Sequence, residues 1–172
     1  SLAAGGKDGG MAVLATAPGE PTEVHALENG ALRPLSHQND KLRDELQLAT
    51  VADFTSQNKD GTLVHGLLTR PAGAADGVKL PTVLYIHGGP HAMYGEGFFH
   101  EFQVLANAGL LVLIANPRGS TGYGEEFANS VQFRYPGDDY RDLMAALDAV
   151  ISRGYVDTAR LGVGGGSGGG VL

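Results

Sequence analysis

Short runs of alternating apolar and polar residues fill the first part of the chain. They predict β-strands over residues 11–16, 22–27 and 31–35, because a period of two is typical of a half-buried strand. The last two runs are joined by Glu-Asn-Gly at 28–30, and Asn-Gly between apolar runs is a strong hairpin signal. So few short strands cannot bury a face of their own. We therefore expect residues 1–45 to be the end of a larger all-β domain.

A polar stretch at residues 39–47 marks the boundary to a second domain, over 46–172. That domain opens with a hairpin, whose strands cover 50–56 and 62–69. Buried-strand and amphipathic-helix patterns then alternate, which is typical of an α/β fold with a mostly parallel sheet and helices on both faces. In such sheets the chemistry lies at the carboxyl ends of the strands. The further expected strands are 82–86, 110–115 and 160–163, and the expected helices are 99–108 and 140–151.

Charge and composition limit the function classes. Residues 1–79 carry 7 basic and 10 acidic side chains and residues 80–172 carry 5 and 9, so the net charge of −7 leaves no basic patch for nucleic acid. No run approaches the roughly 20 apolar residues of a membrane span, so we expect no membrane partner. The absence of cysteine excludes disulfides, a thiolate nucleophile and thiolate metal sites.

The first residues of the chain bear on its cellular location. The N-terminus lacks the basic segment and apolar run of a signal peptide, and on that ground we expect a cytoplasmic location. A periplasmic or secreted location stays open, because residues 1–6 read as the interior of a longer sequence. The oligomeric state is open as well, a homo-oligomer included.

A glycine cluster follows the last expected strand. Seven of the 27 glycines lie between Gly162 and Gly170, and they surround Ser167 in the pattern Gly-x-Ser-x-Gly. After a buried strand, this pattern predicts a tight, strained turn that holds a serine hydroxyl above the sheet and leaves its neighbours no room for side chains. Ser167 is therefore the predicted nucleophile. The backbone N–H of Gly168 is a predicted donor to the substrate's carbonyl oxygen.

A second signal lies at the end of another expected strand. His87-Gly88-Gly89-Pro90 directly follows the strand over 82–86. An oxyanion needs two fixed donors, each worth about 3–4 kcal/mol, and the Gly89 N–H is the candidate for the second. An ordinary strand-end turn is the alternative interpretation. The two signals support each other because they occur in the order expected for an oxyanion loop and a nucleophile elbow.

Four motifs occur in this order along the chain: 87–95, Asn-Pro-Arg-Gly-Ser within 116–124, Asp142-Leu143 and 165–170. Together they resemble the prolyl oligopeptidase family of serine peptidases, nearest its acylaminoacyl-peptidase branch, and Asn-Pro-Arg-Gly-Ser is the most specific of the four. The resemblance implies the N-terminal half of an α/β-hydrolase fold, preceded by the last blade of a β-propeller. It also implies a peptidase that needs no cofactor and acts on short peptides.

The resemblance carries specific roles to this sequence. It implies that Ser167 is the nucleophile and that the N–H groups of Gly168 and Gly89 bind the oxyanion. It also implies a catalytic Asp and then a His beyond Leu172, the chain order usual on this fold. Gly168 departs from the family, which commonly has a larger residue there. We accordingly expect the 1–172 chain alone to be inactive and to expose an apolar edge after Val163.

Several other interpretations of these residues compete with this one. None of the six histidines is expected to act as the base, and a structural role is favoured for His87. His87 and His91 cannot share a helix face across Gly-Gly-Pro, so we expect no metal site. We expect Arg118 to pair with a neighbouring acid, and Asp139 and Asp142 to be helix-start and solvated-face charges.

The function classes that compete are an esterase on the same fold, a dinucleotide-binding domain and a scaffold. Residues 164–169 satisfy G-x-G-x-x-G after a strand, as a dinucleotide site would. In dinucleotide-binding domains, however, that motif normally follows the first strand, whereas residues 164–169 follow several earlier strands of their domain. The scaffold interpretation applies to the 1–172 chain taken alone, because a serine without a base is a weak nucleophile.

Overall fold

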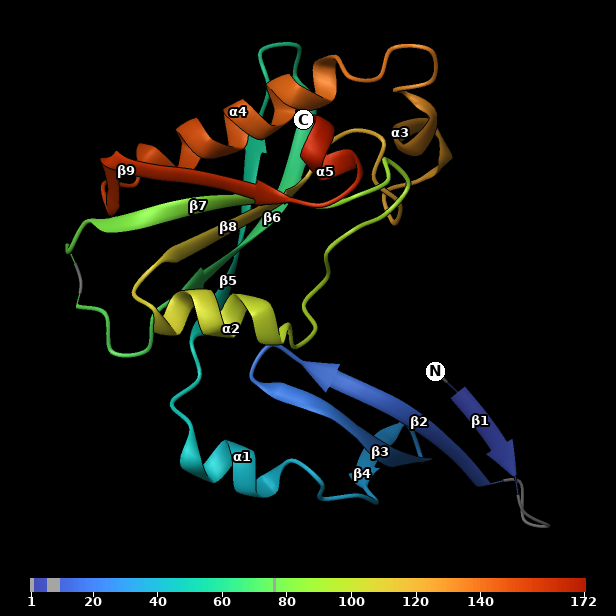
Figure 1. The fold of residues 1–172 in the computed structure, drawn as a ribbon. Helices are drawn as coiled ribbons and strands as arrows, with labels where there is room; N and C mark the ends of the chain where they lie inside the picture. The colour runs from blue at the N-terminus through green and yellow to red at the C-terminus, as the bar shows by residue number, and fades with distance from the viewer. Residues whose placement is uncertain (1, 6–9, 76) are drawn as a thin grey trace.

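The structure is a computed structural model that describes residues 2–5, 10–75 and 77–172. It contains two β-sheets of different size (Figure 1). The smaller one is N-terminal and antiparallel, with the strand order β1-β2-β3-β4. A short helix, α1, follows it. These elements are β1 (Leu2–Gly5), β2 (Gly10–Ala17), β3 (Glu20–Glu28), β4 (Ala31–Pro34) and α1 (Asp40–Glu45).

The N-terminal sheet confirms the three predicted strands and adds β1, which the pattern does not predict. Asn29 and Gly30 both have positive φ, 51° and 79°, in the turn between β3 and β4. Two successive residues with positive φ are what a tight two-residue hairpin of primed type requires. The Asn-Gly signal therefore predicted this hairpin correctly.

The larger sheet is mixed, in the order β5-β6-β8-β7-β9. Its first two pairings, β5 with β6 and β6 with β8, are antiparallel, whereas β7 pairs in parallel with both β8 and β9. The prediction of a mostly parallel sheet is therefore wrong for the described residues, because the predicted hairpin of β5 and β6 joins the sheet with β6 antiparallel to β8. The strands are β5 (Thr50–Gln57), β6 (Leu63–Arg70), β7 (Leu80–Ile86), β8 (Leu111–Asn116) and β9 (Val156–Gly165).

Helices cover both faces of this sheet, as predicted (Figure 1). Central strand β8 is buried along its whole length and supplies side chains to two cores. On one face, Leu111 and Leu113 pack with Leu143 of α4. On the other face, Val112 and Ile114 pack with Phe102 of α2. The helices are α2 (His100–Asn107), α3 (Glu125–Asn129), α4 (Asp138–Ile151) and α5 (Gly168–Val171).

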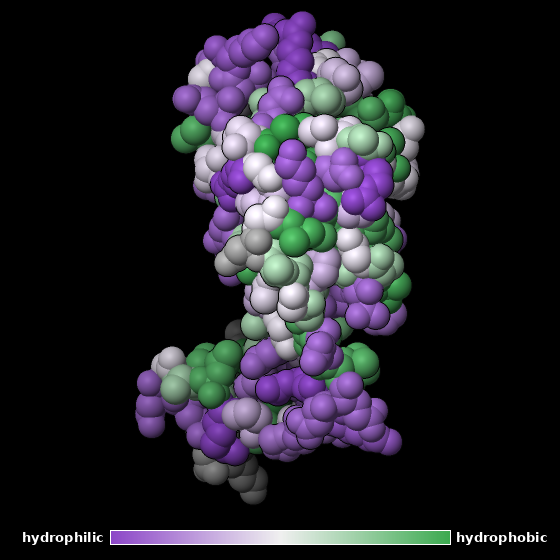
Figure 2. Space-filling view, turned by 90° about the vertical axis from the view of Figure 1, so that its left-hand side faces the viewer, coloured by the Kyte–Doolittle hydropathy of each residue, from purple (hydrophilic) through white to green (hydrophobic). Residues whose placement is uncertain are grey.

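The N-terminal sheet lies on the α2 side of the larger sheet (Figure 1). A hydrogen bond joins the two parts: the Phe98 N–H, just before α2, donates to Thr16 Oγ1 of β2 at 3.1 Å. Figure 2 shows the N-terminal part as a smaller lobe, connected to the larger lobe through a narrower region. None of the helices in the described ranges has the length and apolarity needed to cross a membrane.

Strand β9 occupies an edge of the larger sheet, beside β7. It begins at Val156, four residues before the predicted strand, because its first residues pair with Leu80 across an irregularity in the register. Val163 is 69% exposed on this edge. Because β7 and β9 are parallel neighbours, their carboxyl ends meet, and the segments that follow Ile86 and Gly165 are brought together.

Candidate active site

The turn between β9 and α5 has the strained geometry that the sequence predicts. Ser167 has φ 56° and ψ −117°, a conformation that residues with a Cβ rarely adopt and that costs of order 1–3 kcal/mol. A Cβ added to Gly165 would lie 2.6 Å from the carbonyl oxygen of Ile86, and one added to Gly169 would lie 2.8 Å from the carbonyl carbon of Ile86. Both distances are shorter than van der Waals contact. The prediction that these glycines have no room for side chains is confirmed.

The loop after β7 lies directly against this turn. A Cβ placed on Gly88 would be 3.4 Å from Ser167 Cβ, and one placed on Gly168 would be 3.1 Å from the backbone nitrogen of Gly89. The structure thus brings Ser167, Gly168 and Gly89 together from two separate segments. The Gly89 N–H donates to no other residue within the described part of the chain. Such an arrangement can bind the oxygen of an acyl group that Ser167 attacks.

Side-chain hydrogen bonds fix the residues around this loop. The buried ring of His87 has Nδ1 2.6 Å from the Gly88 carbonyl oxygen and Nε2 2.9 Å from Ser120 Oγ. Ser120 Oγ in turn donates to the Pro117 carbonyl oxygen at 2.6 Å. These bonds agree with the structural role that the sequence favours for His87. Among the described residues, no histidine hydrogen-bonds to the Ser167 hydroxyl.

Arg118 anchors the loop after β8. Its Nε donates to Asp142 Oδ2 at 2.8 Å and one terminal nitrogen donates to Asp60 at 2.7 Å, which confirms the predicted pairing with an acid. These bonds, chiefly the one to Asp142, raise the pKa of Arg118. Asp60 keeps a pKa of about 2, first because it accepts the Thr62 N–H and then because of Arg118.

Of two carboxylates of α4, Asp142 contradicts the sequence prediction and Asp139 agrees with it. Asp142 was expected on a solvated face and Asp139 at the helix start, but Asp142 is 0% exposed and Asp139 is 1% exposed. Asp142 is buried because it neutralises Arg118 and accepts the Arg118 backbone N–H. Asp139 does lie in the first turn, where its Oδ1 accepts the Gly137 N–H at 2.5 Å.

Tyr135 is a neighbour of the site that sequence reasoning missed. Its hydroxyl donates to the Gly168 carbonyl oxygen at 3.1 Å and lies 2.8 Å from the place that a Cβ on Gly168 would take. Burial, and secondarily the charge of Asp139, raises the pKa of Tyr135. The loop that carries it has no periodic pattern, so nothing in the sequence places this ring at the elbow. Tyr135 fills space that a larger residue at position 168 would need.

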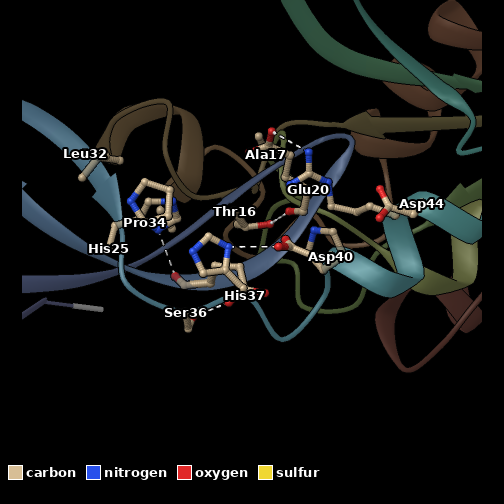
Figure 3. A pocket seen from close by; sticks show the side chains of 14 residues that line it. Thr16, Ala17, Glu20, His25, Leu32, Pro34, Ser36, His37, Asp40 and Asp44 are labelled. Atoms are coloured by element: carbon tan, nitrogen blue, oxygen red, sulfur yellow. Dashed lines mark hydrogen bonds and ion pairs between the residues drawn. The ribbon is translucent and has the colours of Figure 1, made fainter.

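A polar pocket of about 670 Å³ lies elsewhere, on the N-terminal sheet (Figure 3). Several polar side chains that line it bond one another: Glu23 accepts from Ser36, and His37 contacts Asp40 at 3.0 Å. Neither Ser167 nor either predicted oxyanion donor lines it. Within the described ranges, no group of three histidine, aspartate or glutamate side chains is placed to hold a metal ion.

Comparisons with known proteins bear on this site. The model of the prolyl oligopeptidase family matches residues 96–172, which include both the Arg118 loop and the Ser167 turn. An uncharacterized peptidase of Bacillus subtilis, YuxL, is 45% identical over 159 residues, an alignment that covers 91% of this chain and 24% of the relative. This chain belongs to the prolyl oligopeptidase family.

Further members of that family agree with the assignment. Acylamino-acid-releasing enzyme 1 of Oryza sativa subsp. japonica is 33% identical over 139 residues, covering 81% of this chain and 16% of the enzyme. The solved structure of an acylaminoacyl peptidase in complex with Z-Gly-Gly-Phe-chloromethyl ketone matches with a TM-score of 0.87 and 30% identity, over 94% of this chain and 26% of that protein. The chain therefore spans about a quarter of the length of these proteins or less. No finding favours the dinucleotide-binding alternative.

Proposed function

We propose that the protein containing this chain hydrolyses short peptides through an acyl-enzyme formed on Ser167. The observation that carries the proposal is the convergence of the strained serine with two backbone N–H groups. In the first step Ser167 Oγ attacks the scissile carbonyl carbon and loses its proton to a general base. The negative charge that develops on the carbonyl oxygen is stabilised by the N–H groups of Gly168 and Gly89.

Breakdown of the tetrahedral intermediate releases the amine, which takes up the proton that the base accepted. Water then attacks the acyl-enzyme with help from the same base and restores the Ser167 hydroxyl. We propose that this base is a histidine, oriented by an aspartate, and that both follow Leu172, in keeping with the chain order of the fold. On this proposal the 1–172 chain by itself is inactive.

The test uses a fluorophosphonate probe on the full-length protein. We expect rapid labelling of the wild-type protein and none of Ser167→Ala, because the probe reacts with an activated serine. Labelling that persists in Ser167→Ala would refute the assignment. Peptide amide and ester substrates of the same acyl group then separate a peptidase from the alternative esterase. A peptidase cleaves both, whereas turnover of the ester alone would support an esterase.

We further propose that the substrates are oligopeptides with a blocked N-terminus. The support is the name of the rice relative, an acylamino-acid-releasing enzyme, and of the matching acylaminoacyl peptidase structure. Matched substrates that differ only in N-acetylation test this point. A kcat/KM that is equal or higher for the free amine would contradict it.

We also propose that residues 1–45 are the last blade of a β-propeller and that residues 46–172 begin the peptidase domain. A four-stranded antiparallel sheet is the unit of such a propeller. Large apolar side chains remain exposed on it, Leu14 at 50% and Leu32 at 51% among them, and neighbouring blades would cover them. Figure 2 shows hydrophobic side chains at the surface of this lobe. Cleavage rates over a series of peptide lengths test the proposal, since a propeller that screens the site excludes long substrates.

A further inference from the structure

The helix that begins at the Ser167 turn is built from residues that form helices poorly. Three of the four residues of α5 are glycines, and each glycine in a helix is less favourable than alanine by about 4- to 5-fold. Ser167 directly before them has a strained backbone. The residues of this turn therefore do little by themselves to keep it closed, and contacts from outside α5 decide how firmly it is held.

One such contact reaches the first residue of α5. Within the turn, the Gly170 N–H donates to the Ser167 carbonyl at 2.9 Å, and the Leu172 N–H donates to the Gly168 carbonyl at 3.2 Å. The Gly168 carbonyl oxygen also accepts the Tyr135 hydroxyl at 3.1 Å. Tyr135 lies 33 residues earlier in the chain, in the segment between α3 and α4. Its hydroxyl thus ties the start of α5 to a separate part of the peptidase fold.

The same hydroxyl lies on the side of Gly168 where a side chain would begin. A Cβ on Gly168 would be 2.8 Å from the Tyr135 hydroxyl oxygen and 3.1 Å from the backbone nitrogen of Gly89. Tyr135 therefore approaches the backbone of the residue whose N–H is one of the two proposed oxyanion donors. A larger residue at position 168 would exclude this approach, so the glycine and the tyrosine fit each other.

Tyr135 is itself fixed from both ends of its loop. Before it, buried Val131 packs closely on Gly119, where an added Cβ would lie 2.9 Å from the valine side chain. After it, buried Asp139 accepts the Gly137 N–H. Burial, and then the charge of Asp139, raises the pKa of Tyr135, so its hydroxyl keeps the proton that it donates at neutral pH.

From this geometry we propose that Tyr135 is a positioning residue of the reaction. Its hydroxyl holds the glycine-rich start of α5 in place, and with it the Ser167 side chain and the Gly168 N–H. The inference rests on the proposed function, since it assigns a role within that reaction. Tyr135 does not touch the substrate in this role. It acts through the backbone of the turn.

Removal of one hydroxyl tests this role. Tyr135→Phe keeps the ring and loses the bond to Gly168. Tyr140→Phe is the matched control, because Tyr140 lies nearby at the start of α4, is 50% exposed, and donates its hydroxyl to no residue in the described part of the chain. A third change, Gly170→Ala, strengthens α5 without Tyr135, since the nearest atom to the new Cβ is the Gly165 oxygen at 3.9 Å.

The experiment measures kcat and KM of the full-length variants on a peptide amide, with thermal melting as the folding control. We expect Tyr135→Phe to lower kcat by about 3- to 10-fold, the factor of one ordinary hydrogen bond, with KM changed by less than about 2-fold. Tyr140→Phe should stay within about 2-fold of the wild-type kcat. Adding Gly170→Ala to Tyr135→Phe should restore kcat to within about 2-fold of wild type, because alanine supplies helical preference in place of the lost bond.

Several results would overturn the inference. An unchanged kcat in Tyr135→Phe would do so, and so would an equal loss in Tyr140→Phe. A double variant no faster than Tyr135→Phe would mean that the hydroxyl contacts the substrate directly, since a stronger helix cannot replace such a contact. A higher KM at unchanged kcat in Tyr135→Phe would lead to the same conclusion.

Hydrogen exchange of residues 165–172 supplies a readout that does not depend on catalysis. Measured by mass spectrometry on the full-length protein without substrate, exchange should be about 3- to 10-fold faster in Tyr135→Phe and slower again in the double variant. Equal exchange in wild type and Tyr135→Phe would contradict the role of the hydroxyl. If the wild-type protein shows no Ser167-dependent cleavage, the proposed function itself fails, a result distinct from an active protein whose kcat and exchange are indifferent to Tyr135.

Discussion

Gly169 offers a sharp test of the elbow, because a single methyl group there has nowhere to go. In Gly169→Ala the new Cβ would lie 2.8 Å from the carbonyl carbon of Ile86, closer still to its oxygen, and 3.1 Å from the His87 oxygen. All three are backbone atoms, which cannot swing aside as a flexible side chain can. The strand end of β7 and the start of α5 must therefore separate by roughly 1 Å before contact is normal.

That displacement has two measurable consequences. Overpacking of this kind costs about 1–3 kcal/mol of stability. It also moves Gly168 away from Gly89, and a misplacement of about 1 Å in a reacting constellation lowers rates by about 10²-fold. We expect Gly169→Ala in the full-length protein to label with a fluorophosphonate about 100 times more slowly than wild type. Its melting temperature should also be lower.

Gly170→Ala is the matched control. A Cβ there would meet nothing nearer than the Gly165 oxygen at 3.9 Å, and alanine favours a helix over glycine by about 1 kcal/mol. This variant should label at the wild-type rate. Equal labelling rates for Gly169→Ala and Gly170→Ala would refute the close packing of the elbow against β7.

Three further predictions follow from the charges and the sheet edge. Asp142→Ala should lower the free energy of unfolding, measured in denaturant, by about 3–5 kcal/mol. The reason is that it leaves the largely buried guanidinium of Arg118 without its main partner. A loss below about 1 kcal/mol would contradict this prediction. The pKa of Asp60 is lowered to about 2 by the Thr62 N–H and then by Arg118. Its carboxylate therefore stabilises the fold at pH values above the ordinary aspartate pKa, and this stabilisation is lost as the pH falls toward 2. Wild-type protein should thus melt above Asp60→Asn at pH 7 and level with it near pH 2, and a gap that does not narrow would refute the assignment. Val163→Lys should reduce self-association of the 1–172 chain, measured by sedimentation, because it places a charge on the exposed edge of β9. Unchanged association would show that the β9 edge is not the surface through which the chains associate.

The sequence predicted most elements of the fold because their signals are local. Asn29-Gly30 is typical of a tight two-residue hairpin turn. The continuous apolar run of β8 is typical of a central strand that is buried on both faces of a sheet. The start of β9 at Val156 escaped prediction because residues 157–160 carry no alternating pattern and pair irregularly. The mixed sheet escaped prediction because local patterns do not show which strand the predicted hairpin pairs with, and β6 pairs antiparallel with β8.

The site was predictable where its chemistry depends on backbone shape. Positions 165 and 169 must be glycine because the backbone of Ile86 approaches them closely. That requirement appears in the sequence as the Gly-x-Ser-x-Gly motif. Contacts between side chains that are far apart in the sequence produce no such motif. The burial of Asp142 depends on Arg118 and Asn58, which are far from it in sequence, and the position of Tyr135 depends on a loop without periodicity.

The parallel pairing of β7 with β9 has a consequence for how the protein acquires its activity. Ile86 is aligned with Gly165, yet β8 and α4 lie between them in the chain. A contact so distant in sequence forms only after a long loop has closed, which makes it slow and entropically costly. Reactivity of Ser167 therefore reports on the end of folding and not on its beginning. During refolding, we expect helical structure to recover before the probe can label the protein.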